Sequence, residues 1–394
     1  MRSKKFLIIS FFIIVFGVFA FYPIKAILLR SGKITMVSGD NWITYRGSSA
    51  KGLGRIKDKI YSLETAIDNR TSNYFPFYDL ITSGFYNVNI SLDSLFSNQV
   101  FVKTNVDGEN VFFDSENQHF FLTNNLSKND KNARIENQIA FYNDIAQKYP
   151  NVDIYVYLPL RYETTKLNNY YNENEYVEYF IKKLDSKIKV QTLSSATIQE
   201  YLNQFYKTDH HMTAYGSFAS YKNILSMMGI NSSEQYSFVT VKSPYYGSMA
   251  KSALSKKVSD TFTDIDAKSV VNTNLNDPKF KPRTIGNKAN PFYDYYVGYF
   301  NSQYDEVIYT SDTETNRNLL IISDSLAWQM DYLLAKHFSK TYVINMRSGK
   351  WQKEDLLLGN YIKENNITDI LFLQEAEQQM FDVYNHHLSE RVVR

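Results

Sequence analysis

The last quarter of the chain carries the pattern that most constrains its fold. Runs rich in aliphatic and β-branched residues lie at 318–323, 340–347 and 367–374. Two segments with helical character, 325–338 and 353–366, separate them. Parallel strands joined through helices make right-handed crossovers in nearly all proteins. This alternation therefore predicts a doubly wound α/β fold, in which helices cover a mostly parallel sheet.

The same alternation occurs earlier in the chain. Residues 152–160 and 188–193 have the composition of buried strands, and we expect a helix between them at 172–184. A further helix is expected at 132–150, where isoleucines and aromatic residues lie on one side. Before it, 111–124 has the pattern of a hairpin, with aromatic strands about a polar turn. Both halves of the chain are therefore expected to contribute to an α/β layer.

At the other end of the chain, residues 6–22 form an apolar run that three basic residues precede. A run of about 17 residues lies at the short end of the range for a membrane-spanning helix, and the basic start favours an orientation with the N-terminus inside. We predict a membrane anchor at 1–30 and a stalk at 31–58. The alternative is a cleaved signal peptide, since 18–20 has the form of a cleavage site. Either interpretation places the remainder outside the cytoplasm, on a single-pass anchor in the cell membrane or secreted.

Charge and composition exclude several classes of protein. Lys and Arg number 43 and Asp and Glu 41, a net charge of +2, whereas a general nucleic-acid binder carries a strong basic excess. Cysteine is absent, which excludes disulfides, thiolate metal sites and cysteine nucleophiles. Hydrophobic residues make up 44% and can fill a sizeable core. We expect one domain over 59–394, with a less regular insertion at about 231–316.

Ser325 lies where the strand expected at 318–323 runs into the next helix. Ligands of open α/β sheets bind at the carboxyl ends of the strands, and free N–H groups at a helix N-terminus can stabilise an oxyanion. Ser325 is therefore a candidate nucleophile. The alternative is structural, because Ser and Asp are favoured as helix N-caps simply to satisfy those N–H groups.

The sequence TDHHMT places Asp209 beside His210 and His211 in a chain with 6 histidines. A serine becomes a good nucleophile when a base takes its proton and a third group orients the base. Asp209 and His211, two residues apart on a loop, can serve Ser325 in this way while His210 points elsewhere.

Two other interpretations of this loop remain open. Asp209, His210 and His211 are possible zinc ligands, and the histidines at 386–387 could add another. Adjacent side chains in an extended loop diverge, and no HExxH or similar helical spacing occurs, so we expect no metal and no other cofactor. A polar loop without chemistry is the third interpretation.

The segment TDHHMTAYGSFASYKNI resembles the signature of the DHHW-motif proteins, which are related to the alginate O-acetyltransferases of the SGNH-hydrolase-like superfamily. In those relatives a T-D-x-H-W-T segment supplies an acid and a base, and a later serine at the end of a strand supplies the nucleophile. The resemblance implies that Asp209 orients the base, His211 is the base and Ser325 is the nucleophile. The chain order Asp, His, Ser is that of a permuted branch, and the implied fold is an SGNH-like, three-layer α/β/α domain.

Other segments carry the resemblance more loosely. SPYYGSMAKS resembles a Y-x-G-S stretch of the family, and YVINMR takes the place of a strand that tends to end in arginine. The resemblance thus implies substrate or oxyanion contacts for Tyr246, Ser248 and Arg347. Two departures matter, because Met212 replaces the tryptophan of the motif and Ser323 replaces a glycine before the Asp-Ser pair. We expect Met212 to alter the shape of the pocket and the Ser323 side chain to crowd the turn.

The resemblance implies an extracytoplasmic O-acyltransferase of the bacterial cell envelope, an O-acetyltransferase of a cell-surface or secreted polysaccharide that works through an acyl-serine. The polysaccharide would be the acceptor, and a membrane-bound acyltransferase partner would deliver the acyl group, as is usual in the family. An esterase that removes acyl groups with the same triad is the second hypothesis. A membrane-anchored scaffold or binding protein without catalysis is the third.

Overall fold

The computed structural model describes most of the chain after residue 77. The described residues are 78–104, 109–168, 171, 173–266, 275–276, 292, 295–300, 305–346, 350–351 and 356–381. Contacts divide the chain into two units, residues 1–92 with 288–293 and residues 93–287 with 294–394. Of the first unit the structure describes mainly helix α3 (Tyr78–Asp93), and the second unit holds the other described elements.

Several predictions fall on residues outside the described ranges. They are the anchor at 1–30, the stalk at 31–58 and the contact of Arg347. Among the helices that the structure describes, none combines the length and the apolar character needed to cross a membrane.

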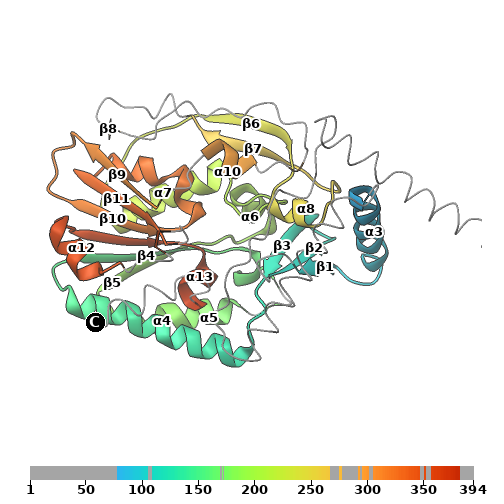
Figure 1. The fold of residues 1–394 in the computed structure, drawn as a ribbon, viewed down its shortest axis with the longest axis horizontal. Coiled ribbons are helices and arrows are strands. Elements are labelled where there is room, and N and C mark those ends of the chain that lie inside the picture. Colours follow the sequence, from blue (N-terminus) through green and yellow to red (C-terminus); the bar gives the residue numbers. More distant parts are fainter. Residues whose placement is uncertain are drawn as a thin grey trace, which may run out of the picture. The chain divides into compact units, whose positions relative to one another are not determined.

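A seven-stranded sheet forms the centre of the second unit (Figure 1). In spatial order its strands are β5 (Ile188–Leu193), β4 (Asp153–Pro159), β12 (Asp369–Leu373), β10 (Asn318–Ser323), β11 (Lys340–Asn345), β9 (Glu306–Ser311) and β8 (Leu275–Asn276). The first five run parallel, whereas β9 pairs antiparallel with both β11 and β8. The predicted α/β fold with a mostly parallel sheet is confirmed.

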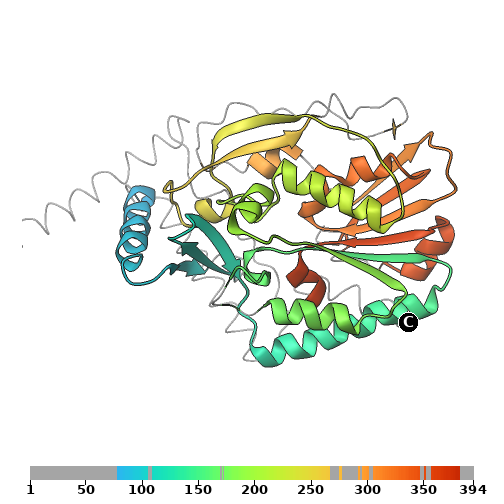
Figure 2. The same cartoon turned by 180° about the vertical axis from the view of Figure 1, so that it is seen from behind.

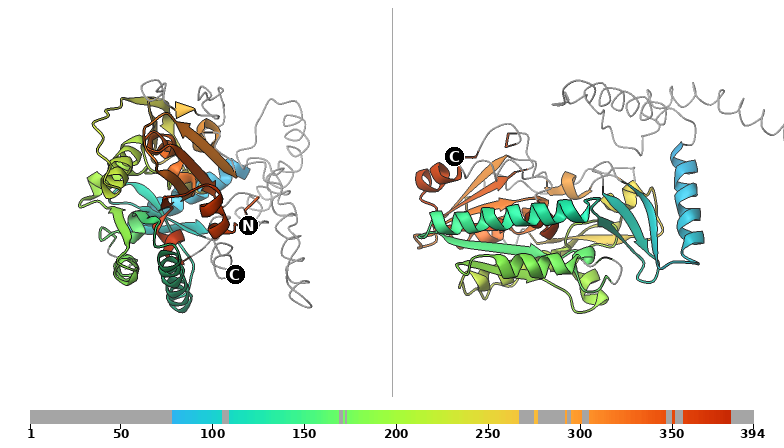
Figure 3. Two further views of the ribbon diagram at one scale, coloured as in Figure 1. Left: turned by 90° about the vertical axis from the view of Figure 1, so that its left-hand side faces the viewer. Right: turned by 90° about the horizontal axis from the view of Figure 1, so that it is seen from below.

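The parallel strands are buried on both faces, because successive residues alternate between two hydrophobic clusters. In β10, Leu319 and Ile321 pack in one cluster, and Leu320 and Ile322 pack in the other. Helices lie on both faces of the sheet, as Figure 2 and Figure 3 show from other directions. One face carries α7 (Ala214–Met227) and α11 (Asp331–Ala335), and the other carries α4 (Lys128–Lys148), α5 (Asn174–Lys183) and α12 (Leu358–Glu364). These layers form the expected α/β/α arrangement.

The chain reverses its direction across the sheet at β10. From β10 it crosses to β11 through α11, and from β11 it returns to β12, on the other side of β10, through α12. The two connecting helices pack on opposite faces of the sheet. Open α/β sheets bind ligands in the crevice that such a reversal leaves at the carboxyl ends of the strands. Ser325 lies at this point, two residues after β10.

Two smaller sheets lie outside the main one. The strands β1 (Gln99–Thr104), β2 (Asn110–Asp114) and β3 (His119–Thr123) form an antiparallel sheet that includes the predicted hairpin. The strands β6 (Phe238–Tyr245) and β7 (Asp260–Ile265) pair with each other, and α8 (Ser248–Ser252) lies between them in the chain.

The insertion at about 231–316 is more regular than the sequence predicts. Besides β6, α8 and β7 it contains β9 and α10 (Tyr295–Phe300), and α10 packs on Phe262 of β7. These elements form through contacts between residues far apart in the chain, which local periodicity does not report.

The helix predicted at 325–338 is broken in the structure. Residues Ser325–Gln329 form a 3₁₀ helix, η2, and α11 begins only at Asp331, because Met330 leaves the helical region with φ −132°. The remaining short helices are η1 (Tyr162–Thr164), α6 (Ile198–Gln204) and α13 (Ala376–Phe381). η1 follows the carboxyl end of β4 and α13 follows that of β12, so both lie near the turn after β10.

Candidate active site

The loop at 208–211 is fixed at both of its ends. On the side of α7, Thr213 is the N-cap, and its side chain accepts from the N–H of Gly216 at 3.2 Å. On the other side, Thr208 donates its hydroxyl to Asp260 of β7 at 2.6 Å. The loop is therefore held between a helix of the main layer and the β6–β7 sheet.

The buried carboxylate of Asp209 is surrounded by hydrogen-bond donors. Its Oδ1 accepts from the backbone N–H of His211 at 3.2 Å and from the ring Nδ1 at 2.6 Å. Its Oδ2 accepts from the Tyr245 hydroxyl at 2.5 Å and from the N–H of Ser248 at 2.8 Å. A Cβ at Gly247 would lie 2.3 Å from the Asp209 side chain, so glycine is needed for this close approach.

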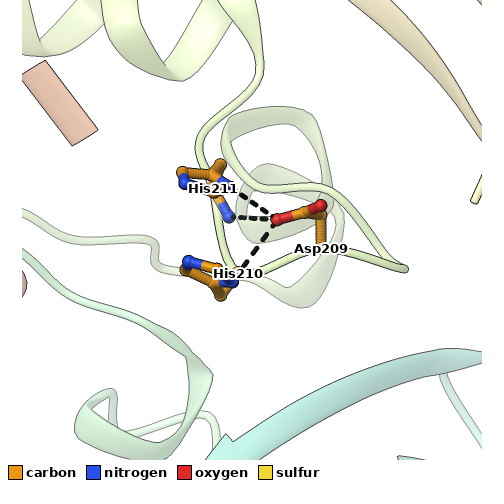
Figure 4. A group of neighbouring side chains, drawn as sticks. All are labelled: Asp209, His210 and His211. Carbon is orange, nitrogen blue, oxygen red and sulfur yellow. Dashed lines mark hydrogen bonds and ion pairs between the residues drawn. The ribbon is translucent and has the colours of Figure 1, made fainter. Parts of the chain in front are cut away.

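His211 links Asp209 to Ser325. Because an ionised carboxylate can only accept, Nδ1 of His211 carries the proton in the bond to Asp209. The other ring nitrogen, Nε2, then accepts from the Ser325 hydroxyl at 2.8 Å. Figure 4 shows the rings of His210 and His211 both turned toward the Asp209 carboxylate. The structure therefore brings Asp209, His211 and Ser325 together, in the arrangement that activates a serine nucleophile.

The charge states of this loop follow from its surroundings. Burial alone would raise the pKa of Asp209, but the charges and hydrogen bonds of His211, His210 and Tyr245 outweigh it and hold that pKa well below its ordinary value. Burial, together with the neighbouring His211, lowers the pKa of His210 to about 3. At neutral pH Asp209 is therefore ionised and His210 is neutral.

Asp324 shapes the turn that presents Ser325. Its Oδ1 accepts from the N–H of Leu326 at 2.8 Å, and its Oδ2 accepts from the N–H of Glu375, after β12, at 2.9 Å. Asp324 is thus the N-cap of η2, and the Ser325 hydroxyl is left for His211. The free helix N-terminus expected for an oxyanion is not present at Leu326, because the Asp324 side chain takes that N–H.

The spacing of Asp209, His210 and His211 would also suit a metal ion, because one potential ligand atom from each lies within 4.8 Å of the others. Hydrogen bonds already use both ring nitrogens of His211 and Nδ1 of His210. The part of the chain that the structure describes has no second group of three potential ligands, and 386–387 lie outside it. We therefore interpret this group as a hydrogen-bonded cluster.

The structure places the three weaker candidates differently. Ser248 binds the Asp209 carboxylate through its N–H at 2.8 Å and its hydroxyl at 3.3 Å. Tyr246 is half-buried beside Tyr245, whose hydroxyl is the one bonded to Asp209. Arg347 lies outside the described residues. Contacts of these three residues with a substrate or an oxyanion stay predictions.

The two departures from the family motif are accommodated within the core. Met212 is 1% exposed and belongs to the hydrophobic cluster under α7, so it changes packing behind the loop. The Ser323 hydroxyl donates to the carbonyl of Ile344 on the neighbouring strand β11 at 3.4 Å. The crowding of the turn that we expected from Ser323 is not observed.

The sequence did not predict the aromatic residues that surround His211. Tyr296 of α10 stacks on the His211 ring with 3.6 Å between centroids and 12° between planes. Trp328 stacks on Tyr296 at 5.8 Å, and Phe262 contacts both Tyr245 and Tyr296. No local signal could have singled them out, since the chain has 32 tyrosines and 27 phenylalanines.

A second buried charged cluster surrounds Arg161, which follows β4. Its guanidinium lies within 4 Å of four carboxylates, and we call these five residues the Arg161 cluster. The distances are 2.6 Å to Glu163, 3.1 Å to Glu375, 3.1 Å to Glu377 and 3.9 Å to Glu109. Burial raises the pKa of Glu163 and of Glu377, and the charge of Arg161 offsets this only in part.

Glu375 joins the Arg161 cluster to the candidate site. Its carboxylate lies 3.9 Å from Nε2 of His210, and its N–H donates to Asp324, the residue before Ser325. The two clusters are therefore neighbours at the carboxyl ends of β4, β10 and β12.

Comparison with known proteins identifies the fold. No protein-family model and no curated protein matches the chain. The structure of Bacillus cereus PatB1 with a sulfonyl adduct matches with a TM-score of 0.53 at 21% sequence identity, over 71% of this chain and 99% of that one. A second structure of PatB1 gives a TM-score of 0.54 at 19% identity, over 70% and 99%. A DHHW family protein from Eubacterium siraeum gives 0.52 at 17% identity, over 73% and 99%.

These structures share the fold of this chain at identities too low to carry a function across. The chain thus has the fold of PatB1 and of a DHHW family protein, and the resemblance to the DHHW proteins that its motif predicts is confirmed for the fold.

Proposed function

We propose that the chain is an O-acyltransferase, and that it transfers acetyl groups to a polysaccharide through an acyl-serine. The observation that carries this proposal is the hydrogen-bond chain from Asp209 through His211 to Ser325, with distances of 2.6 and 2.8 Å. These residues lie at β10, where the path of the chain across the sheet reverses. Open α/β sheets usually bind their ligands at such a point. The sulfonyl adduct recorded for PatB1 adds support, since sulfonyl reagents react with activated nucleophiles.

In the first half-reaction His211 takes the proton of Ser325 as Oγ attacks the carbonyl carbon of the acyl donor. The bond from Oγ to that carbon forms, and the bond to the leaving group of the donor breaks. The leaving group receives the proton from His211. Asp209 holds the ring in the tautomer that can accept from Ser325 and stabilises the imidazolium that forms.

In the second half-reaction a sugar hydroxyl takes the place of the leaving group. His211 accepts its proton while its oxygen attacks the carbonyl carbon of the acyl-serine. The bond between that carbon and Oγ breaks, and Ser325 recovers its proton from His211. Water in the position of the sugar would give an esterase with the same residues, so acceptor binding decides between the two reactions.

The setting of the reaction follows from the predicted anchor. We infer that the domain is held at the outer face of the cell membrane by residues 1–30. Free acetyl-CoA is not expected there, so a membrane-bound acyltransferase partner would supply the acetyl group. The polysaccharide acceptor would be a component of the cell envelope.

Intact-mass spectrometry of the full chain after exposure to p-nitrophenyl acetate tests the first half-reaction. We expect one acetyl adduct, lost in Ser325→Ala and in His211→Ala. Ser323→Ala is the matched control, because this serine lies two residues away and contacts the carbonyl of Ile344 rather than His211. Absence of an adduct in the unsubstituted chain would overturn the proposal and favour a scaffold.

Adding chitopentaose or cellopentaose to the acetylated chain tests the second half-reaction. Acetyl esters on the sugar, formed as the adduct disappears, would support a transferase. Release of free acetate alone, at the same rate with and without sugar, would instead identify an esterase.

A further inference from the structure

Tyr296 makes the closest ring contact of the candidate site. Its ring lies 3.6 Å from that of His211, centroid to centroid, and the two planes are 12° apart. His210 contacts the same imidazole at 4.0 Å and 35°. Two rings cannot occupy one face of an imidazole at such distances, so they lie on opposite faces. His211 is therefore clamped between Tyr296 and His210.

The hydroxyl of Tyr296 reaches the nucleophile as well. It donates to the backbone carbonyl of Ser325 at 3.1 Å. The N–H of the same peptide unit belongs to Leu326 and is bound by the Asp324 side chain at 2.8 Å. The peptide plane that follows Ser325 is thus held at both of its polar groups. Tyr296 contacts the base with its ring and the nucleophile with its hydroxyl.

Tyr296 is itself rigidly packed. The side chain is 1% exposed, and it contacts Phe300 at 4.8 Å, Trp328 at 5.8 Å and Phe262 at 6.0 Å. Burial raises the pKa of the Tyr296 hydroxyl well above its ordinary value, so the phenol stays neutral and remains a donor. A buried ring with one rotamer and one bonded hydroxyl can hold its neighbours in a fixed geometry.

We propose that Tyr296 is a positioning residue that sets the alignment of His211 with Ser325, an inference that rests on the proposed acyl-serine chemistry. The stacked ring keeps the imidazole in the plane in which Nε2 faces Oγ, and the hydroxyl fixes the peptide that carries Oγ. The face of the phenol ring also stabilises the positive charge that His211 gains in each half-reaction, as aromatic faces do for cations. α10 therefore contacts His211 through the ring of Tyr296, and the β6–β7 sheet contacts Asp209 through the hydroxyl of Tyr245.

Steady-state hydrolysis of p-nitrophenyl acetate by the full chain separates the two contributions of Tyr296. Tyr296→Phe keeps the ring and loses the hydroxyl, and we expect kcat to fall about 5-fold. Tyr296→Leu loses both, and we expect kcat to fall about 100-fold, the order found when a reacting group is misplaced by about 1 Å. KM should change much less than kcat, because the residue acts on the base and not on the ester.

Tyr299→Leu is the matched control, since it removes a buried ring from the same helix, and that ring contacts Phe262 and Phe300. We expect it to lower the thermal unfolding temperature about as much as Tyr296→Leu while retaining most of kcat. Equal kcat in Tyr296→Leu and the unsubstituted chain would overturn the inference, and so would equal losses in the two leucine variants. If the unsubstituted chain forms no acyl-serine at all, the proposed function fails first. If it does and Tyr296→Leu matches it, only the role of Tyr296 fails.

Discussion

Two neighbouring clusters of this protein bury carboxylates to a similar degree and leave them in opposite states. At the candidate site the Asp209 carboxylate receives bonds from the motif loop, from Tyr245 and from Ser248, and its pKa is held well below its ordinary value. In the Arg161 cluster one guanidinium faces four carboxylates, and the pKa of Glu163 and of Glu377 rises.

The difference shows that burial alone does not decide the protonation state of these groups. What decides it is the supply of donors, since each Asp209 oxygen has its own donors whereas the carboxylates around Arg161 share one cation. The first arrangement keeps one charge state over a wide range of pH, which suits an acid that must orient a base. In the Arg161 cluster, Glu163 and Glu377 change their protonation state near neutral pH.

The largest effect is expected for Asp209→Asn. The amide is nearly the same size but can donate to His211 and stabilise the wrong tautomer, so the rate of Ser325 acylation should fall about 10⁴-fold. Initial rates with p-nitrophenyl acetate measure it, and Asp153→Asn is a control because that aspartate is mainly exposed. A loss of less than about 10-fold would contradict the role of Asp209 in orienting His211.

Replacing Arg161 tests the second of the two clusters. Arg161→Met leaves three buried carboxylates and that of the half-buried Glu109 without their shared cation. We expect the free energy of unfolding to fall by about 3–5 kcal/mol at pH 8. The loss should be smaller at about pH 5, where the glutamates can be protonated. Chemical denaturation measures both, with Lys189→Met, which breaks an exposed ion pair, as the control. An unchanged stability at pH 8 would mean that the cluster is not held by Arg161.

Gly247→Ala tests how tightly the donors around Asp209 are placed. The new Cβ would lie 2.3 Å from the Asp209 side chain, so the carboxylate must move. A shift of that kind should lower the acylation rate about 100-fold while the fold remains. At Gly84 an added Cβ meets nothing within 4 Å, so Gly84→Ala should retain the full rate. Equal rates in both variants would contradict the close approach.

The pH dependence of stability gives the sharpest contrast between the two clusters. The pKa of Glu163 is raised from 4.5 to about 7 and that of Glu377 to about 8, so between these values the folded chain binds more protons than the unfolded chain. Their contribution to stability is therefore complete below about pH 4.5 and is lost as the pH rises toward 8. Asp209 has the opposite sign, because its contribution is lost only as the pH falls below its ordinary pKa of 3.8.

Glu163→Gln should flatten the decline in stability between about pH 5 and pH 8, because the amide does not titrate in that range. Denaturation at several pH values measures the slope. An unchanged slope in this variant would show that Glu163 titrates at its ordinary pKa.

The sequence predicted the features that have a local pattern, which are the strands of the main sheet and the motif loop. The strands β10 and β12 are near-continuous apolar runs, as expected for a sheet covered on both faces. The TDHHMT motif contains Asp209 and His211, which the structure brings together with Ser325. The position of Ser325 at the end of a strand was visible because a strand-to-helix junction leaves a clear change of period.

What the sequence did not predict depends on contacts between distant segments. Tyr245 and Tyr296 reach the site only because β6 pairs with β7 and α10 packs on Phe262, and neither contact has a local signature. The contact of Asp324 with the segment after β12 is also long-range, since Oδ2 of Asp324 accepts from the N–H of Glu375. The Arg161 cluster likewise gathers residues 109, 161, 163, 375 and 377, which no spacing in the sequence relates.

The most direct test of the account is to map the site of covalent modification by phenylmethylsulfonyl fluoride on the full chain. Peptide mass spectrometry should place a single adduct on Ser325, lost in Ser325→Ala and formed at least about 10³-fold more slowly in His211→Ala. Ser323→Ala should react at the unsubstituted rate. An adduct that survives Ser325→Ala, or a Ser325 that reacts equally fast without His211, would contradict the claim that these residues form one nucleophilic unit.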